Sequence, residues 1–383
     1  MEKLRTSLKV NLKRLAVTLI DLVKIPSPPG EEADIAKAVA GRLEELGLKP
    51  SIDEYFNVKA ELGTKGKTIV LNAHLDHVPP SEGWSFNPYE GKLENSRIYG
   101  VGASDNKSGV AAMLEIAEIL SQVEEALQGR VVFLFTSREE TSLGKDEARS
   151  RVLHGLKADG GLCLDTHLLS EDGKANLVVG CRGILNLTLM VLGRAYHSSE
   201  PEKGINSIYI SMRYIQALRK LKLPRSKRKP PVRANLSVTK IATNGWATRI
   251  PDKCTLTINY RALPEENLEK AKDRLLKLAS KKCMEGFKLE SVEASRGYRL
   301  NLREPMVKAS LAALKELGLK AKLTVSRGWI DAASFKLKAG IPMVGLGTPT
   351  KGQAHVPNEW EDLECLKTGA QAALMATLKF LEN

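Results

Sequence analysis

Cysteine is scarce in this chain of 383 residues, and the cysteines that are present form no pattern. Their number is odd, they are scattered, and none has the C-x-x-C spacing of paired or metal-binding thiols. We therefore expect free thiols rather than a disulfide framework, as in a protein of the reducing cytoplasm. The five cysteines are Cys163, Cys181, Cys254, Cys283 and Cys365.

The sequence also lacks a long apolar segment. No stretch approaches the roughly 20 apolar residues that a membrane-spanning helix requires. Near the N-terminus, apolar positions alternate with Lys13, Arg14 and Asp21, as in an amphipathic helix, so no secretory signal is expected. Apolar residues nevertheless make up 43% of the chain, which is enough for globular packing. The length predicts about two domains.

Positive charge is in excess, with a formal net charge of +13. Part of it is concentrated in residues 220–233 (KLKLPRSKRKPPVR), which contain seven Lys and Arg and no acidic residue. Such a segment can be a solvated loop, a surface that recruits an acidic substrate or partner, or a nucleic-acid site. No aromatic residue interleaves it and no nucleic-acid-binding motif surrounds it, so we favour the solvated loop and expect no nucleic acid.

The first part of the chain shows alternating helix and strand periodicity. Its apolar strands end in polar residues, which indicates an α/β fold with a mixed sheet covered by helices on both faces and a site at the strand ends. Helices are expected over residues 10–24, 32–47 and 108–127, and strands over residues 69–78, 130–137 and 160–165.

From about residue 182 the pattern becomes strand, helix, strand, strand, helix, strand. This order predicts a ferredoxin-like unit of about 110 residues. Helix–strand alternation then returns over 304–381. If His355 in this last part shares a site with the first part, residues 1–181 and 294–383 form one discontinuous domain and residues 182–293 are an insertion. The expected elements of the insertion are 184–195, 205–221, 234–243, 253–263, 266–282 and 288–295.

Side chains of the types that bind metals stand where predicted strands end. Two histidines and several carboxylates suit two adjacent divalent ions that share one bridging carboxylate. Two such ions with a free carboxylate base activate water, so the sequence predicts a hydrolase. The residues are His74, Asp76, Asp105, Glu139, Glu140, Asp165 and His355.

Each segment also has a plainer interpretation when taken alone. His74 and Asp76 would share one face of a strand, with Asp76 orienting the His74 ring, or His74 is simply a hydrogen-bonded histidine at a strand end. Asp105 follows Gly100 and Gly102, which allow a tight loop aimed into a site, or it caps the next helix.

The pair Glu139–Glu140 follows an apolar strand, where adjacent side chains diverge. One carboxylate would bind metal while its neighbour faces the water, or both form a solvated charge pair. Asp165 and His355 are ambiguous singly. Because all five segments lie at strand–loop junctions, we interpret them as one site.

The motifs around these residues resemble those of the co-catalytic zinc amidohydrolases and exopeptidases. This family includes acetylornithine deacetylase, succinyl-diaminopimelate desuccinylase, aminoacylase and glutamate carboxypeptidase. The resemblance covers nearly the whole chain, and the segment after His74 is closest to the deacetylase and desuccinylase branch. The motifs are HLDHVPPSEGW (74–84), YGVGASDNKSG (99–109), TSREE (136–140), AYHSSEPEKGINSI (195–208), RIPDKCTLTINYRAL (249–263) and GWIDAASF…GIP…AHVPNEW (328–360).

The resemblance implies a set of metal ligands. His74 and Asp165 would bind one ion, Glu140 and His355 the other, and Asp105 would bridge them. Asp165 stands where others of the family have Glu, which many members tolerate. The implied ions are two per chain, with zinc foremost and cobalt or manganese as alternatives.

The resemblance also implies the roles of the neighbouring residues. Glu139 would be the general base and later the acid, and Asp76 would support His74. A cis peptide bond between Asp105 and Asn106 is expected as well.

Further implied residues would bind the substrate. His197 would stabilise the oxyanion in the site of the partner subunit, so the insertion would be a lid and dimerisation domain; a surface histidine is the alternative. Arg261 would hold the substrate carboxylate, with a backbone contact from Gly328. Thr248 replaces the usual Asn, and Trp329 follows Gly328 where many members carry a smaller residue. Both departures bear on which substrate is bound.

We therefore expect an enzyme that cleaves the amide of N-acyl-L-amino acids, of the deacetylase or desuccinylase type. A dipeptidase or metallocarboxypeptidase is the alternative, because the same site cleaves either amide. The basic excess mildly favours an acidic substrate or carrier. A remote alternative is a non-catalytic binding protein that uses residues 220–233, and a single-metal peptidase is a further variant.

Overall fold

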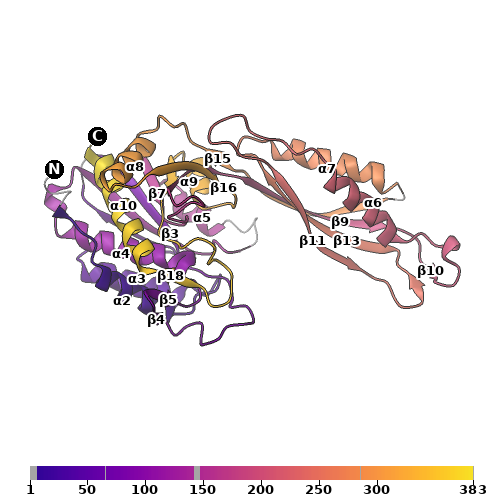
Figure 1. Cartoon of the computed structure of the whole chain (residues 1–383), viewed down its shortest axis with the longest axis horizontal. Coiled ribbons are helices and arrows are strands. Elements are labelled where there is room, and N and C mark those ends of the chain that lie inside the picture. Colours follow the sequence, from indigo (N-terminus) through magenta and orange to yellow (C-terminus); the bar gives the residue numbers. More distant parts are fainter. Residues whose placement is uncertain (1–6, 65, 142–146, 285, 383) are drawn as a thin grey trace. The chain divides into compact units, whose positions relative to one another are not determined.

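The computed structural model describes residues 7–64, 66–141, 147–284 and 286–382, which form two units (Figure 1). The first unit comprises Met1–Gly180, Leu300–Ser326 and Ile330–Asn383, and the second comprises Cys181–Arg299 and Arg327–Trp329. The predicted end of the insertion at residue 293 is too early, because it falls inside strand β14 (Phe287–Ser295) of the second unit. The assignment of residues 327–329 to the first domain is also wrong.

The first unit is built on a mixed sheet, as predicted. Its strands run in the order β1–β2–β6–β3–β7–β17–β8, and β16 also pairs with β8. Strands β6, β3, β7 and β17 are parallel, whereas β2 and β8 are antiparallel to their neighbours β6 and β17. The strands are β1 (Ser51–Ile52), β2 (Val58–Leu62), β3 (Lys67–His74), β6 (Gly129–Thr136), β7 (Gly160–Cys163), β8 (Ala175–Cys181), β16 (Ala321–Ser326) and β17 (Met343–Gly345).

Helices cover both faces of this sheet, as predicted. On β3, Ala73 faces Gly109 of helix α4. The neighbouring Asn72 points the other way and donates a hydrogen bond to Thr136 (3.0 Å), which donates to Asp331 at the start of helix α9 (2.7 Å). Because side chains alternate along a strand, α4 and α9 lie on opposite faces. The helices are α2 (Leu12–Val23), α3 (Ala33–Glu45), α4 (Ser108–Ser121), α5 (Glu147–Leu153), α8 (Pro305–Glu316), α9 (Ala332–Lys338) and α10 (Leu363–Glu382).

The second unit has the predicted strand–helix order. Its antiparallel sheet has the order β11–β13–β9–β14, which is the ferredoxin-like arrangement. Helices α6 and α7 lie side by side on one face, where Tyr214 donates a hydrogen bond to the carbonyl of Leu275 (3.0 Å; Figure 1). The elements are β9 (Gly183–Leu192), α6 (Ser207–Arg219), β11 (Asn235–Thr243), β13 (Lys253–Ala262), α7 (Leu268–Lys282) and β14 (Phe287–Ser295).

Short strands complete both units. In the first unit, β4 (Lys92–Glu94), β5 (Arg97–Tyr99) and β18 (Trp360–Asp362) form a small sheet. In the second unit, β10 (Tyr196–His197) pairs with β12 (Arg249–Ile250), and β15 covers Tyr298–Arg299. All five cysteines are free, as predicted. Among the described residues, every helix is too short or too polar to cross a membrane.

Candidate metal centre

The predicted metal-binding side chains of the first unit gather where its parallel strands end. His74 is the last residue of β3, the pair Glu139–Glu140 follows β6, and Asp165 follows β7. Asp105 lies in the turn Ala103–Lys107 before α4, and His355 lies in the loop before β18. The carboxyl ends of neighbouring parallel strands meet at one edge of a sheet, which explains how distant segments reach one site.

Five of these side chains form two groups that share Asp105. The His74 Nε2 atom lies 3.1 Å from Asp105 Oδ1 and 3.9 Å from Asp165 Oδ1. The His355 Nε2 atom lies 2.8 Å from Glu140 Oε1 and 3.5 Å from Asp105 Oδ2. In each group of three, one ligand atom per residue lies within 4.8 Å of the others. The two oxygens of Asp105 thus face two different groups.

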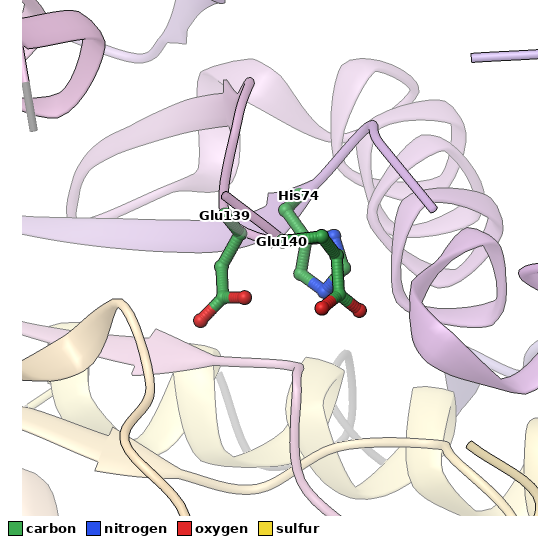
Figure 2. A group of neighbouring side chains, drawn as sticks. All are labelled: His74, Glu139 and Glu140. Atoms are coloured by element: carbon green, nitrogen blue, oxygen red, sulfur yellow. The ribbon is translucent and has the colours of Figure 1, made fainter. Parts of the chain in front are cut away.

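The adjacent carboxylates Glu139 and Glu140 diverge, as expected at a strand end. Figure 2 shows Glu140 beside the His74 ring, while the Glu139 side chain extends away from Glu140. Glu139 groups with His74 and Glu140 but belongs to neither of the groups that contain Asp105. Glu140 therefore belongs to the group that contains His355, whereas Glu139 lies outside both of the groups that contain Asp105.

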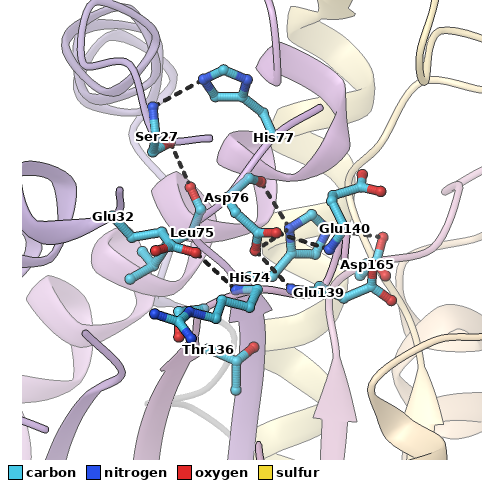
Figure 3. A network of polar contacts seen from close by, with 12 residues as sticks. Ser27, Glu32, His74, Leu75, Asp76, His77, Thr136, Glu139, Glu140 and Asp165 are labelled. Atoms are coloured by element: carbon cyan, nitrogen blue, oxygen red, sulfur yellow. Dashed lines mark hydrogen bonds and ion pairs between the residues drawn. The ribbon is translucent and has the colours of Figure 1, made fainter. Parts of the chain in front are cut away.

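The backbone of Asp76 orients the His74 ring. His74 Nδ1 lies 2.9 Å from the carbonyl oxygen of Asp76, which can only accept, so Nδ1 carries the hydrogen and Nε2 keeps its lone pair for a ligand bond. The Asp76 carboxylate, which was predicted to hold this ring, also pairs with it, with its Oδ1 3.5 Å from Nδ1. The same carboxylate accepts from the amides of Glu139 (3.0 Å) and Glu140 (2.8 Å; Figure 3). The predicted strand over residues 69–78 is too long, because β3 ends at His74.

The site concentrates negative charge away from solvent. Burial, and then the charge of Glu140, raises the pKa of Glu139 well above its ordinary value. Burial, and then the charge of Asp105, does the same to the pKa of Asp165. Divalent cations would remove this repulsion, and a donor set of imidazole nitrogens and carboxylate oxygens suits zinc, cobalt or manganese. The residues present therefore fit two metal ions.

Comparison with known proteins agrees with this arrangement. A family model described as peptidase family M20/M25/M40 matches residues 70–379, which is most of the chain. The chain belongs to this family. The resemblance found in the motifs is therefore confirmed, and this M20/M25/M40 member is a hydrolase that acts on C–N amide bonds in a metal-dependent family.

Proteins named desuccinylase and solved peptidase structures are among the matches. A putative succinyl-diaminopimelate desuccinylase of Mycobacterium tuberculosis is 27% identical over 347 residues, covering 88% of this chain and 90% of the relative. A tripeptidase structure from Staphylococcus aureus has a TM-score of 0.81 at 24% identity and covers 98% of this chain and 100% of its own. An M20 metallo-carboxypeptidase from Sulfolobus solfataricus has a TM-score of 0.80 at 21% identity, covering 96% and 99%. The two structures share the fold of this member.

One buried carboxylate of the site was not assigned a role from the sequence. Glu359 accepts hydrogen bonds from the backbone amides of Gly102 (3.1 Å), Ser104 (2.8 Å) and Asp105 (3.0 Å). It thus fixes the loop that carries the shared aspartate. The peptide bond from Asp105 to Asn106 is cis, as the resemblance implied. Glu359 lies in the AHVPNEW motif, but a motif does not reveal which backbone amides a carboxylate will face.

A buried ion pair supports the other side of the site. Arg149 Nε lies 3.2 Å from Asp331 Oδ1, and the same guanidinium donates to the carbonyl of Arg138 (3.0 Å), next to Glu139. Arg138 has a positive φ of 58°, as His355 does (61°), a region that non-glycine residues rarely adopt. Such residues cluster at functional sites. The pair Arg149–Asp331 therefore braces the turn that carries the two glutamates.

Replacing Asp331 by alanine is expected to lower the free energy of unfolding by about 3–5 kcal/mol, because it removes the carboxylate that pairs with the buried Arg149 guanidinium. Urea unfolding of the purified protein measures the change. The matched control is Asp34→Ala, which breaks an exposed pair with Lys37 and should cost less than about 1 kcal/mol. Equal losses in the two variants would contradict the bracing role.

The predicted substrate residues all lie in the second unit. His197 of β10 pairs with Arg249 of β12, and the amide of Ser198 donates to the carbonyl of Thr248 (3.0 Å), so His197 and Thr248 are neighbours. Arg261 lies near the far end of β13, with its Nε donating to Asn259 (3.2 Å). The structure therefore groups His197 with Thr248 but not with Arg261.

A buried arginine that was not anticipated, Arg182, accompanies Arg261. The buried Arg182 donates through Nε (2.9 Å) and Nη2 (2.6 Å) to the carbonyl of Arg327, the residue before Gly328. Burial, and then the charges of Arg261 and Arg327, lowers the pKa of Arg182. The second unit thus collects positive charge beside Gly328.

Proposed function

We propose that this protein is a dinuclear metal-dependent amidohydrolase that cleaves the amide of N-acyl-L-amino acids. The observation that carries the proposal is the pair of ligand groups sharing Asp105, with Glu139 beside them. His74 and Asp165 would hold one ion, and Glu140 with His355 the other. When bound, the ions would polarise the scissile carbonyl and lower the pKa of the attacking water.

Glu139 is assigned the proton transfers. Its carboxylate lies outside the groups that contain Asp105, so it is free to accept a proton from the attacking water and to return it to the leaving amine. Asp76 supports this role by accepting from the amides of Glu139 and Glu140, which fixes the direction of both side chains.

His197 is assigned to the oxyanion. The amide of Ser199 donates to His197 Nδ1 (3.2 Å), so in the neutral ring Nε2 carries the hydrogen and can donate to a developing negative charge. We propose that His197 acts on the site of the partner in a homodimer, and that the second unit serves as the dimerisation domain and the lid.

The arginines of the second unit support recognition of a free carboxylate. Arg261 would bind it, with Arg182 and Arg327 adding positive charge and Gly328 a backbone contact. Thr248, next to His197, would contact the substrate on the other side. We assign the deacylase activity first because of the relatives named desuccinylase. A peptidase of the same family is the second candidate, favoured by the tripeptidase and carboxypeptidase folds.

The basic segment 220–233 has a structural role in the second unit. Its Ser226 donates to Glu265 (2.6 Å), and Arg299 donates to the carbonyl of Pro230 (2.6 Å). All of the Lys and Arg residues of the segment are exposed, which supports the solvated loop. Recruitment of an acidic carrier or substrate is a further proposal, and a purely binding protein is a remote one.

A hydrolysis screen tests the function. The zinc- or cobalt-loaded protein is mixed with N-acetyl, N-succinyl and N-formyl amino acids and with dipeptides, and the free amine is measured against a chelated control. Metal-dependent release from N-acyl amino acids supports the proposal. Release from dipeptides alone would replace it by the peptidase, and no release with two metals bound would refute both.

A further inference from the structure

A pocket of about 440 Å³ surrounds His197 within the second unit. Its size lies within the roughly 300–1,000 Å³ of pockets that bind small molecules. None of the described residues that line it is acidic, and these residues include two aromatic side chains, one arginine and the histidine. The lining residues are Ala195, Tyr196, His197, Trp246, Thr248 and Arg249.

The local backbone brings Trp246 to the strand pair that carries Tyr196 and His197. The pairing of β10 with β12 sets His197 opposite Arg249. The Arg249 amide then donates to the carbonyl of Trp246 (3.0 Å), which closes a tight turn with Trp246 at its start. Trp246 is 75% exposed and Tyr196 is 38% exposed. Large aromatic side chains left open to solvent around a pocket are typical of binding sites.

The polar groups that line the pocket favour a ligand in which a carbonyl is attached to an apolar group. His197 presents an Nε2 donor because its Nδ1 accepts from the Ser199 amide. Arg249 is oriented by donation to the carbonyl of Asn244 (2.7 Å). An uncharged acyl chain with an electron-rich carbonyl therefore suits this lining better than a cationic one.

We propose that this pocket is the subsite for the acyl group of the substrate, and that Trp246 makes it selective for bulky apolar acyl groups, aromatic ones foremost. The inference rests on the proposed function, in which His197 donates to the oxygen of the scissile carbonyl. The acyl chain is bonded to the carbon of that carbonyl, so it must lie close to His197. A two-carbon acetyl group offers little surface to an aromatic side chain, whereas a phenylacetyl group carries its own ring.

The test compares N-phenylacetyl-L-alanine with N-acetyl-L-alanine on the metal-loaded enzyme. We expect wild-type kcat/KM to be about tenfold or more higher for the phenylacetyl substrate, since an additional apolar group on a substrate supports discrimination by about 10–200-fold. Trp246→Ala should lose about tenfold on the phenylacetyl substrate and less than about threefold on the acetyl one. Trp246→Phe, which keeps an aromatic face, should retain most of the preference.

Tyr209→Ala is the matched control, because Tyr209 is an aromatic residue of α6 that is 66% exposed and lies outside the pocket. It should leave both rates unchanged. Equal losses on the two substrates in Trp246→Ala, or a wild-type preference for acetyl, would overturn the proposal.

Failure of the proposed function is distinguished by a binding measurement. If the wild-type enzyme hydrolyses neither compound, tryptophan fluorescence is titrated with N-phenylacetyl-L-alanine. A saturable change that is absent in Trp246→Phe supports the subsite although the assigned reaction has failed. A change of equal size in both proteins, or no change in either, overturns the subsite.

Discussion

Replacing Glu139 by alanine is expected to abolish turnover while both metal sites still load. General acid–base groups contribute about 10²–10⁴-fold to rates, and Glu139 is assigned both proton transfers, so the loss should reach or exceed this range. Metal binding should persist because Glu139 belongs to neither of the groups that contain Asp105. The measurement pairs kcat with the number of metal ions per chain after dialysis.

The neighbouring residue supplies the control for this variant. Glu140 faces His355 Nε2 at 2.8 Å, so Glu140→Ala should lose one of the two ions as well as activity. Two adjacent carboxylates would then give two different results. Loss of an ion from Glu139→Ala, with full occupancy in Glu140→Ala, would show that the two roles are exchanged.

Two inactive variants are expected to restore activity when they share a dimer. His197→Ala lacks the oxyanion donor, and Asp105→Ala lacks the shared metal ligand. If His197 serves the partner's site, each mixed dimer contains one site with every group intact. Random pairing makes half of the dimers mixed, so about a quarter of the wild-type activity should return.

The experiment requires that mixed dimers are present. Co-expression with two different affinity tags and sequential purification isolates them, and the isolated fraction should then reach about half of the wild-type activity, since one of its two sites is complete. Each variant purified alone serves as the inactive control. Mixed dimers without activity would place His197 in the site of its own chain.

The long elements of the fold could be predicted from periodicity because each buries a regular face. Strand β11 (Asn235–Thr243) lies within the predicted residues 234–243, and α4 begins at the predicted Ser108. Short strands such as β10 and β12 could not be predicted, because two residues carry no period. The pairing of β10 with β12, which the sequence does not reveal, brings Thr248 beside His197.

The site was predictable where residue type alone indicates the chemistry. Histidine and carboxylate residues that follow apolar strands can be recognised in the sequence as candidate metal ligands. All five predicted ligands come together in the structure. Residues that act through backbone contacts were not predictable. The Asp76 carboxylate holds the amides of two glutamates, and Glu359 holds three amides of the Asp105 loop, yet neither pairing leaves a mark in the sequence.

The contact between Glu359 and the Asp105 loop has a consequence for how the enzyme matures. Glu359 follows Asp105 by 254 residues in the sequence, and His355 lies four residues before Glu359. Because proteins are synthesised from the N-terminus, the loop leaves the ribosome long before these partners. We therefore expect that a nascent chain can bring His74, Asp105 and Asp165 together first, whereas the second proposed ligand group forms only after residues 355–359 have been synthesised.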